Sequence, residues 1–308
     1  MIPFLFQRSL LIALSASLGA ALASTPAPAE EIEAVSSRTS SDYLRKKLPD
    51  GSFEPESYAF AEGGFWSGDR SDKTIDKMGF TEVAETIAGP LASQNFIPAK
   101  DPKTTKLMIM VYWGTTIAPE HASESPVYEN MKDASQRLNQ IWPSSQQHDA
   151  MGNSKLPPPG ASSEYAALTN AIAAVQAENR LRDNLNRRNA SMLGYDSWWD
   201  TTYNAPAGSA QELRKHDMIE ELEQDRYFVV LMAYDFQMMW KDKKPKLLWE
   251  TRFSVSEHHN EFDKHLAAMT AYASQYFGQD SHGLEHRPIP EGRVDVGDLR
   301  NLGSVPEK

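Results

Sequence analysis

A β-hairpin is specified by residues 227–240, YFVVLMAYDFQMMW, followed by KDKKP at 241–245 and KLLWETRFSV at 246–255. The first run is almost wholly apolar, the second is polar, and the third alternates between apolar and polar residues. Two runs of this kind on either side of a short polar segment predict adjacent antiparallel strands. A sheet therefore passes through this part of the chain.

The second strand of this hairpin predicts its own facing, because side chains alternate across a strand. One set points to a packed face: Leu247, Trp249, Thr251, Phe253 and Val255. The intervening residues Glu250, Arg252 and Ser254 predict a second face that is largely exposed to water.

A helix is predicted after the hairpin. Asn260 fits an N-cap, with Asp263 reaching back from the third helical position. The expected buried stripe has helical spacing and consists of Phe262, Leu266, Met269, Ala273 and Phe277. Gly278 is expected to end the helix in the left-handed conformation.

Upstream, three segments predict a strand–helix–strand unit. Residues 57–61 form the first strand, which Gly63-Gly64 is expected to end at a turn. Residues 77–95 carry apolar side chains at helical spacing, and 107–113 are apolar on both pleat faces, as in a central strand.

Residues 115–225 differ in composition and predict an insertion between sheet strands. They are rich in Ser, Gln, Asn, Ala and Pro, with a break at the proline run 157–159. One long helix is expected over 162–192 and a second over about 209–224, and the two would form a helical hairpin. The insertion is expected to decorate the domain and to be separable from it.

The N-terminal residues predict export. Arg8 precedes an apolar run, and Ala21-Leu22-Ala23 fits a signal cleavage site, so residues 1–23 are expected to be a signal peptide. A second possible cut follows Ala29. Residues 24–56 are rich in Ser, Glu, Pro and Ala and predict a disordered tether. The mature protein is expected to be periplasmic or secreted, and soluble.

Cysteine and charge restrict the function further. The chain has no Cys, which excludes a disulfide and a lipid-accepting residue after cleavage, so no stable membrane anchor is expected. Without residues 1–23 the chain holds 30 Lys and Arg against 42 Asp and Glu, a net charge of −12. Such an excess opposes binding to nucleic acid or to an anionic membrane.

The predicted fold class is α+β, with a mixed or antiparallel sheet of four to five strands and helices mainly on one face. The domain would span residues 57–278, with the insertion at 115–225, and residues 279–308 would form a loosely ordered tail.

The order of these elements resembles an uncharacterised family of bacterial envelope proteins, a domain of unknown function with many outer-membrane lipoproteins among its members. The resemblance covers residues 58–113 and 227–277. Its most specific element is the Leu247, Trp249 and Phe253 pattern of the closing strand. The chain departs from the family in lacking the lipidated Cys and in its long insertion, and the family implies no activity.

One group of residues could hold a divalent metal. His258, His259 and His265 lie within eight residues, together with Glu261 and Asp263. Imidazole and carboxylate are ligands of zinc and related ions. A solvated helix N-terminus is the competing interpretation, because acidic residues there favour the helix dipole. Other histidines are sparser, and each is interpreted as a surface residue: His216, His282 and His286.

Aromatic residues form the other candidate site. Trp198, Trp199 and Tyr203 could stack on a ligand or fill a partner's pocket, or they could pack the insertion against the sheet. The sequence has no nucleophile motif and no Gly-rich phosphate loop. Catalytic, cofactor-binding and metal-binding residues are therefore not assigned, and no cofactor is expected.

The preferred function is a non-catalytic envelope module that binds a protein or another envelope component through the insertion and the sheet edge. One alternative is a metal-assisted hydrolase centred on His258, His259 and His265. Another is a small-ligand carrier with an aromatic cleft near Trp198.

Overall fold

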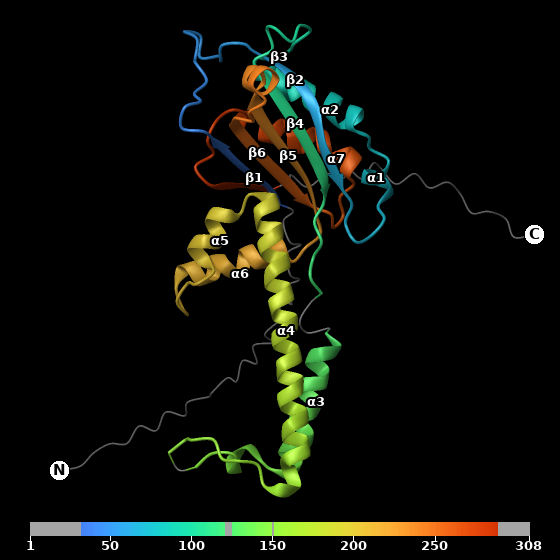
Figure 1. The fold of residues 1–308 in the computed structure, drawn as a ribbon, viewed down its shortest axis with the longest axis vertical. Helices are drawn as coiled ribbons and strands as arrows, with labels where there is room; N and C mark the ends of the chain where they lie inside the picture. Colours follow the sequence, from blue (N-terminus) through green and yellow to red (C-terminus); the bar gives the residue numbers. More distant parts are fainter. Residues whose placement is uncertain (1–31, 121–124, 150, 289–308) are drawn as a thin grey trace, which may run out of the picture. The chain divides into compact units, whose positions relative to one another are not determined.

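A seven-stranded mixed sheet forms the centre of the computed structural model, which describes residues 32–120, 125–149 and 151–288 (Figure 1). The strand order is β3-β2-β4-β5-β6-β1-β7. The α+β class is confirmed, but the predicted four to five strands are too few. The strands are β1 Ile32–Thr39, β2 Glu56–Trp66, β3 Phe96–Pro98, β4 Leu107–Thr115, β5 Arg226–Asp235, β6 Leu247–Ser256 and β7 Leu284–Pro288.

Strands β1 and β7 correct the prediction for the two ends of the domain. β1 lies between β6 and β7 and pairs antiparallel with both. Residues 32–56 are therefore no disordered tether, and residues 279–288 no loosely ordered tail. Neither strand has a regular alternation of apolar and polar residues, and each pairs with strands far away in the chain. The signal peptide, the remaining tether residues 24–31 and the tail residues 289–308 lie outside the described residues.

The predicted hairpin of β5 and β6 is confirmed, with antiparallel pairing along both strands. The first strand is shorter than predicted, because residues 238–242 form a short π-helical turn, η4 Met238–Asp242. Asp235 ends the strand: its Oδ1 accepts a hydrogen bond from Met238 N at 3.0 Å. The connection is therefore a structured turn.

The predicted strand–helix–strand unit is confirmed by the parallel pairing of β2 and β4. Helices α1 Lys73–Asp76 and α2 Phe80–Ser93 lie between these strands in the sequence. The Gly63-Gly64 pair does not end the first strand but lies at a bulge within it. A Cβ on Gly63 would lie 2.5 Å from the Tyr112 ring, so this position requires glycine.

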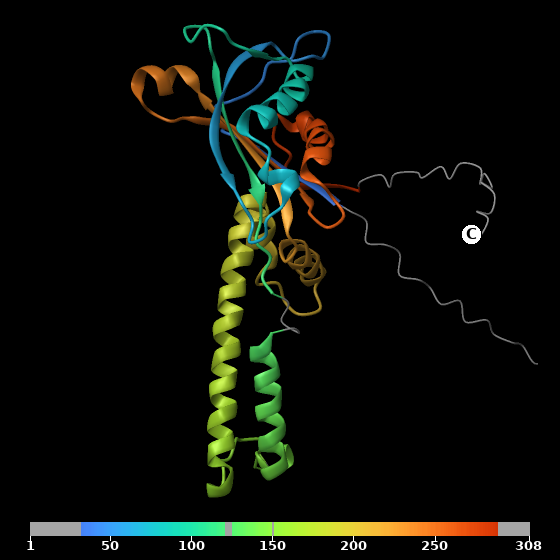
Figure 2. The same ribbon diagram turned by 90° about the vertical axis from the view of Figure 1, so that its right-hand side faces the viewer.

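The first core lies between the sheet and the helices α2 and α7 Phe262–Ala273, on one side of the sheet (Figure 2). The apolar stripe predicted for α7 is fully buried. The 3₁₀ turn η5 Ser274–Tyr276 follows this helix. Gly278 has the predicted positive φ of 69°. The predicted cap is wrong: α7 begins after Glu261, and Asn260 is buried, donating to Ser256 O at 2.8 Å.

The described residues of the insertion contain four α-helices: α3 Pro126–Ile141, α4 Ser162–Leu193, α5 Asp196–Thr202 and α6 Ala210–Leu222. They also contain the 3₁₀ turns η2 Ser144–Gln146 and η3 Pro159–Ala161. The two predicted helices are present as α4 and α6. However, α4 pairs mainly with α3, which the sequence did not predict. We call residues 126–177, which hold α3 and the part of α4 beside it, the arm (Figure 1).

A second core lies on the other face of the sheet. The C-terminal end of α4 packs with α5 and α6 over Phe228 and Val230 of β5, and Leu193, Met218 and Leu222 are almost fully buried there. Helices therefore cover parts of both faces, contrary to the prediction of helices mainly on one face. The C-terminal end of α4 with α5 and α6, which we call the base of the insertion, therefore completes the domain.

Candidate functional site

Half of the second sheet face carries apolar side chains that are only partly buried. Met108, Met110 and Tyr112 extend from β4, and Met232 and Tyr234 extend from β5. Their neighbours in the sequence point to the first core, because side chains alternate along a strand. We call these five residues the Met–Tyr face. In the described part of the chain, the second core packs over the other half of the sheet face, and it also contacts Tyr112 and Met232 at the border of the Met–Tyr face.

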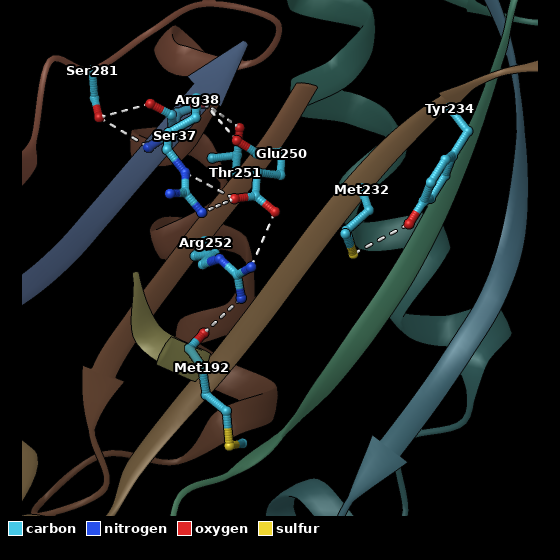
Figure 3. Close-up of polar contacts among 9 residues, drawn as sticks. All are labelled: Ser37, Arg38, Met192, Met232, Tyr234, Glu250, Thr251, Arg252 and Ser281. Carbon is cyan, nitrogen blue, oxygen red and sulfur yellow. Dashed lines mark hydrogen bonds and ion pairs between the residues drawn. The ribbon is translucent and has the colours of Figure 1, made fainter. Parts of the chain in front are cut away.

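Strand register places the side chains of the Met–Tyr face in contact range. Met110 lies opposite Met232, and Met108 lies opposite Tyr234. The Tyr234 hydroxyl donates to the Met232 sulfur at 3.7 Å (Figure 3), and the Tyr112 hydroxyl donates to the Met110 sulfur at 3.9 Å. Burial raises the pKa of Tyr234, and Tyr112 and Glu250 raise it further, so the phenol stays protonated at neutral pH.

A charged network borders the Met–Tyr face. Glu250, directly opposite Met232, is only 6% exposed and lies between two arginines (Figure 3). Arg38 Nε donates to Glu250 Oε1 at 3.0 Å, and Arg252 Nη2 donates to Oε2 at 3.0 Å. The prediction that the second face of β6 is largely exposed to water is therefore wrong for Glu250 and Ser254. Neighbouring strands and the end of α4 cover this part of the strand.

Buried hydroxyl groups fix the position of Arg38. The Oγ of Ser37, the preceding residue, lies 2.7 Å from Thr251 Oγ1, and Ser37 N donates to Ser281 Oγ at 2.9 Å. These contacts join β1 to β6 and to the segment before β7 (Figure 3). Arg38 is therefore held at the border while its side chain remains 59% exposed.

A polar hollow of about 220 Å³ adjoins Arg38. Its lining comes from β1, the α4–α5 junction and the segment before β7: Ser36, Ser37, Arg38, Gly194, Asp196, Ser197, Asp280, His282 and Gly283. Gly194 has a φ of 84°, and a Cβ there would lie 2.6 Å from Ser36 Cβ. The one imidazole in the lining, His282, is 90% exposed and lies 3.5 Å from Asp280.

The histidine cluster is distributed along the turn before α7 and its first turn. His258 and His259 are exposed, with ring centroids 3.8 Å apart. His265 Nδ1 lies 3.0 Å from the Glu261 carbonyl oxygen. Lysines pair with both carboxylates: Lys264 with Glu261 and Lys77 with Asp263, each at 2.6 Å.

The structure does not bring these groups together around one point. Among the residues it describes, no set of three His, Cys, Asp or Glu side chains is arranged to hold a metal ion. His216 is exposed on α6, and His286 Nε2 lies 3.3 Å from Glu221. The hydrolase alternative therefore stays a prediction that metal analysis would test.

The aromatic residues of the insertion pack within the second core. Trp199 is 5% exposed and stacks on Tyr203 with ring centroids 4.6 Å apart. Trp198 lies against His286 at 5.2 Å. This arrangement agrees with the packing interpretation of the three aromatic residues.

Sequence reasoning missed the Met–Tyr face because β4 and β5 resemble strands buried on both faces. The available signal was the recurrence of methionine at alternate positions: Met108 and Met110 in one strand, and Met232 in the other. Methionine adapts its shape readily and is common on surfaces that bind varied partners.

Comparisons with known proteins do not assign this chain to a family. No family model matches it, and no curated protein matches it. The resemblance to envelope proteins therefore stays a prediction. In the part of the chain that the structure describes, every helix is too short or too polar to cross a membrane.

Proposed function

We propose that this chain is a non-catalytic, exported binding module, periplasmic or secreted, which docks an apolar segment of a protein partner on the Met–Tyr face. The observation that carries the proposal is the cluster of five half-buried apolar side chains on adjacent strands. The sequence pointed to the insertion and the sheet edge as the binding surface. The proposed surface lies instead beside the insertion's base.

The chemistry of the border defines the partner. Glu250 is occupied by Arg38 and Arg252, whereas the side chain of Arg38 is 59% exposed. A partner segment with an apolar stripe and one flanking carboxylate would cover the methionines and bond to Arg38. Methionine side chains reshape at little cost, which suits the face to such a segment.

The buried, mutually paired charges support a binding role over a catalytic one. A general base must be accessible to its substrate. Glu250 lies below Arg38 and Arg252 and is only 6% exposed, and Tyr234 keeps its proton at neutral pH because burial raises its pKa. These features suit a preformed docking surface.

A photoreactive residue tests the proposal. p-Benzoylphenylalanine replaces Tyr234 in one exported variant and Tyr165, an exposed tyrosine of the arm, in a matched control. We expect irradiation of intact cells to give a discrete adduct with the Tyr234 variant and none with the Tyr165 control.

A second substitution makes the result specific to the face. Met232→Glu places a carboxylate among the apolar side chains, and it should remove the adduct at position 234. An adduct that persists with Met232→Glu, or that forms equally at position 165, would contradict docking on the Met–Tyr face. Thermal unfolding of each variant controls for loss of the fold.

A further inference from the structure

Three connections meet at one end of the sheet: residues 40–56, 97–106 and 236–246. Strands β2, β4 and β6 begin at this end, and β1 and β5 terminate there. It is the upper end of the sheet in Figure 1. We call these three connections the basic end.

Hydrogen bonds join the three connections into one surface. Gln237 Nε2 donates to the carbonyl oxygens of Pro102 and Thr105, each at 2.8 Å. An ion pair between Lys246 and Asp42 ties the β5–β6 connection to the β1–β2 connection. The surface is therefore fixed by the fold.

Charge sets the basic end apart from the rest of the protein. Its three segments hold ten Lys and Arg against six Asp and Glu, a net charge of +4 in a chain of net charge −11. Arg45 is buried, but eight lysines are exposed: Lys46, Lys47, Lys100, Lys103, Lys106, Lys241, Lys243 and Lys244. An anionic surface would be attracted to this end, although the chain as a whole is acidic.

Large apolar side chains are exposed among these lysines. Leu44 is 88% exposed, Ile97 51%, Trp240 43% and Leu48 39%. Trp240 lies on η4, which projects from the side of the sheet opposite α2 and α7 (Figure 2). Tryptophan and leucine next to lysine are typical of surfaces that enter the interface of a bilayer.

We propose that the basic end docks peripherally on an anionic phospholipid bilayer. The lysines would lie against lipid phosphates, while Trp240, Leu44 and Ile97 would enter the headgroup region. The whole-chain charge predicts repulsion from such a membrane, but charges within a Debye length of about 10 Å dominate the interaction. An acidic peptide is less favoured, because the apolar side chains are spread over three connections.

Vesicle co-sedimentation of the full chain tests this proposal. We expect binding to vesicles of phosphatidylglycerol and phosphatidylcholine, and none to phosphatidylcholine alone. Each lysine near the surface contributes about fivefold in partitioning, so Lys243→Ala with Lys244→Ala should weaken binding by about 25-fold. Trp240→Ala should weaken it independently. The matched control is Lys132→Ala with Lys155→Ala on the arm, which should bind as the unaltered protein does.

Three outcomes would overturn the proposal. The first is failure of the unaltered protein to bind phosphatidylglycerol vesicles at low salt. The second is an equal loss of binding in the arm control. The third is binding to polyglutamate but not to vesicles, which would show that the surface recognises acidic peptides. Circular dichroism of each variant confirms that it is folded.

Discussion

The two parts of the insertion should differ in their effect on stability. Residues 126–177 form the arm, whereas the end of α4, with α5 and α6, completes the second core. Ser125 Oγ donates to Glu178 Oε2 at 2.7 Å, so the two ends of the arm are close together. A short Gly-Ser linker can therefore replace 126–177 without pulling on the sheet.

Deletion of residues 116–222 removes far more. Leu193, Met218 and Leu222 are at most 1% exposed, and truncating such a side chain to Ala typically costs about 2–5 kcal/mol. The deletion also uncovers Phe228 and Val230, which are 1% and 3% exposed. Even at the lower value, the loss of these three side chains would lower the free energy of unfolding by as much as the ~5 kcal/mol that is the whole stability of many domains.

Urea unfolding monitored by circular dichroism distinguishes the two deletions. The arm deletion should keep a cooperative transition with a midpoint close to that of the full chain. The larger deletion should lose cooperativity. An unchanged midpoint after the larger deletion would refute the second core, and unfolding of the arm deletion would show that α3 supports the domain.

Three further predictions concern single residues. Trp249→Ala should lower the free energy of unfolding in urea by about 3–5 kcal/mol, because this side chain is fully buried. Trp240→Ala, at an exposed position, should lower it by less than about 0.5 kcal/mol. Equal changes in the two variants would contradict the assigned burial. Glu250→Ala should lower the free energy of unfolding by about 2–4 kcal/mol, because it leaves Arg252 with the Met192 carbonyl oxygen but no carboxylate partner. A change below about 0.5 kcal/mol would refute the network. Burial raises the pKa of Asp72, but hydrogen bonds donated by the Tyr227 hydroxyl and by Thr74 N outweigh burial and hold this pKa below its ordinary value. The stabilisation by these bonds is therefore present above about pH 4 and is lost as the pH falls through the lowered value. Asp72→Asn should therefore flatten the fall in urea midpoint between about pH 5 and about pH 2.

Much of the first core could be predicted from sequence because its pattern is local. The period of two in residues 249–255 and the helical stripe after Phe262 each identify a buried face without knowledge of the partner. The prediction is wrong for Leu247, because a register shift places it opposite Tyr234 and packs Leu248 against the first core instead. Strand β1 carries no such pattern. It is ordered through pairing with β6 and β7, which lie more than 200 residues away in the sequence.

The candidate site was hidden for a related reason. The face contains three apolar methionines, Met108, Met110 and Met232. A sequence cannot distinguish a strand that is buried on both faces from a strand whose second face is buried along only half of its length. The position of the second core decides this, and it depends on where α4 ends. In the same way, the polarity of Glu250 predicts exposure to solvent. Its burial depends on Arg38, which β1 places directly opposite it.

The binding constant of the partner crosslinked at position 234 tests the central claim most directly. Calorimetry would compare the unaltered chain with Met110→Glu on the Met–Tyr face and Ile172→Glu on the arm. We expect the first substitution to weaken binding at least about tenfold, a loss of about 1.4 kcal/mol, and the second to leave it unchanged. Equal affinity of all three proteins would contradict docking on the Met–Tyr face.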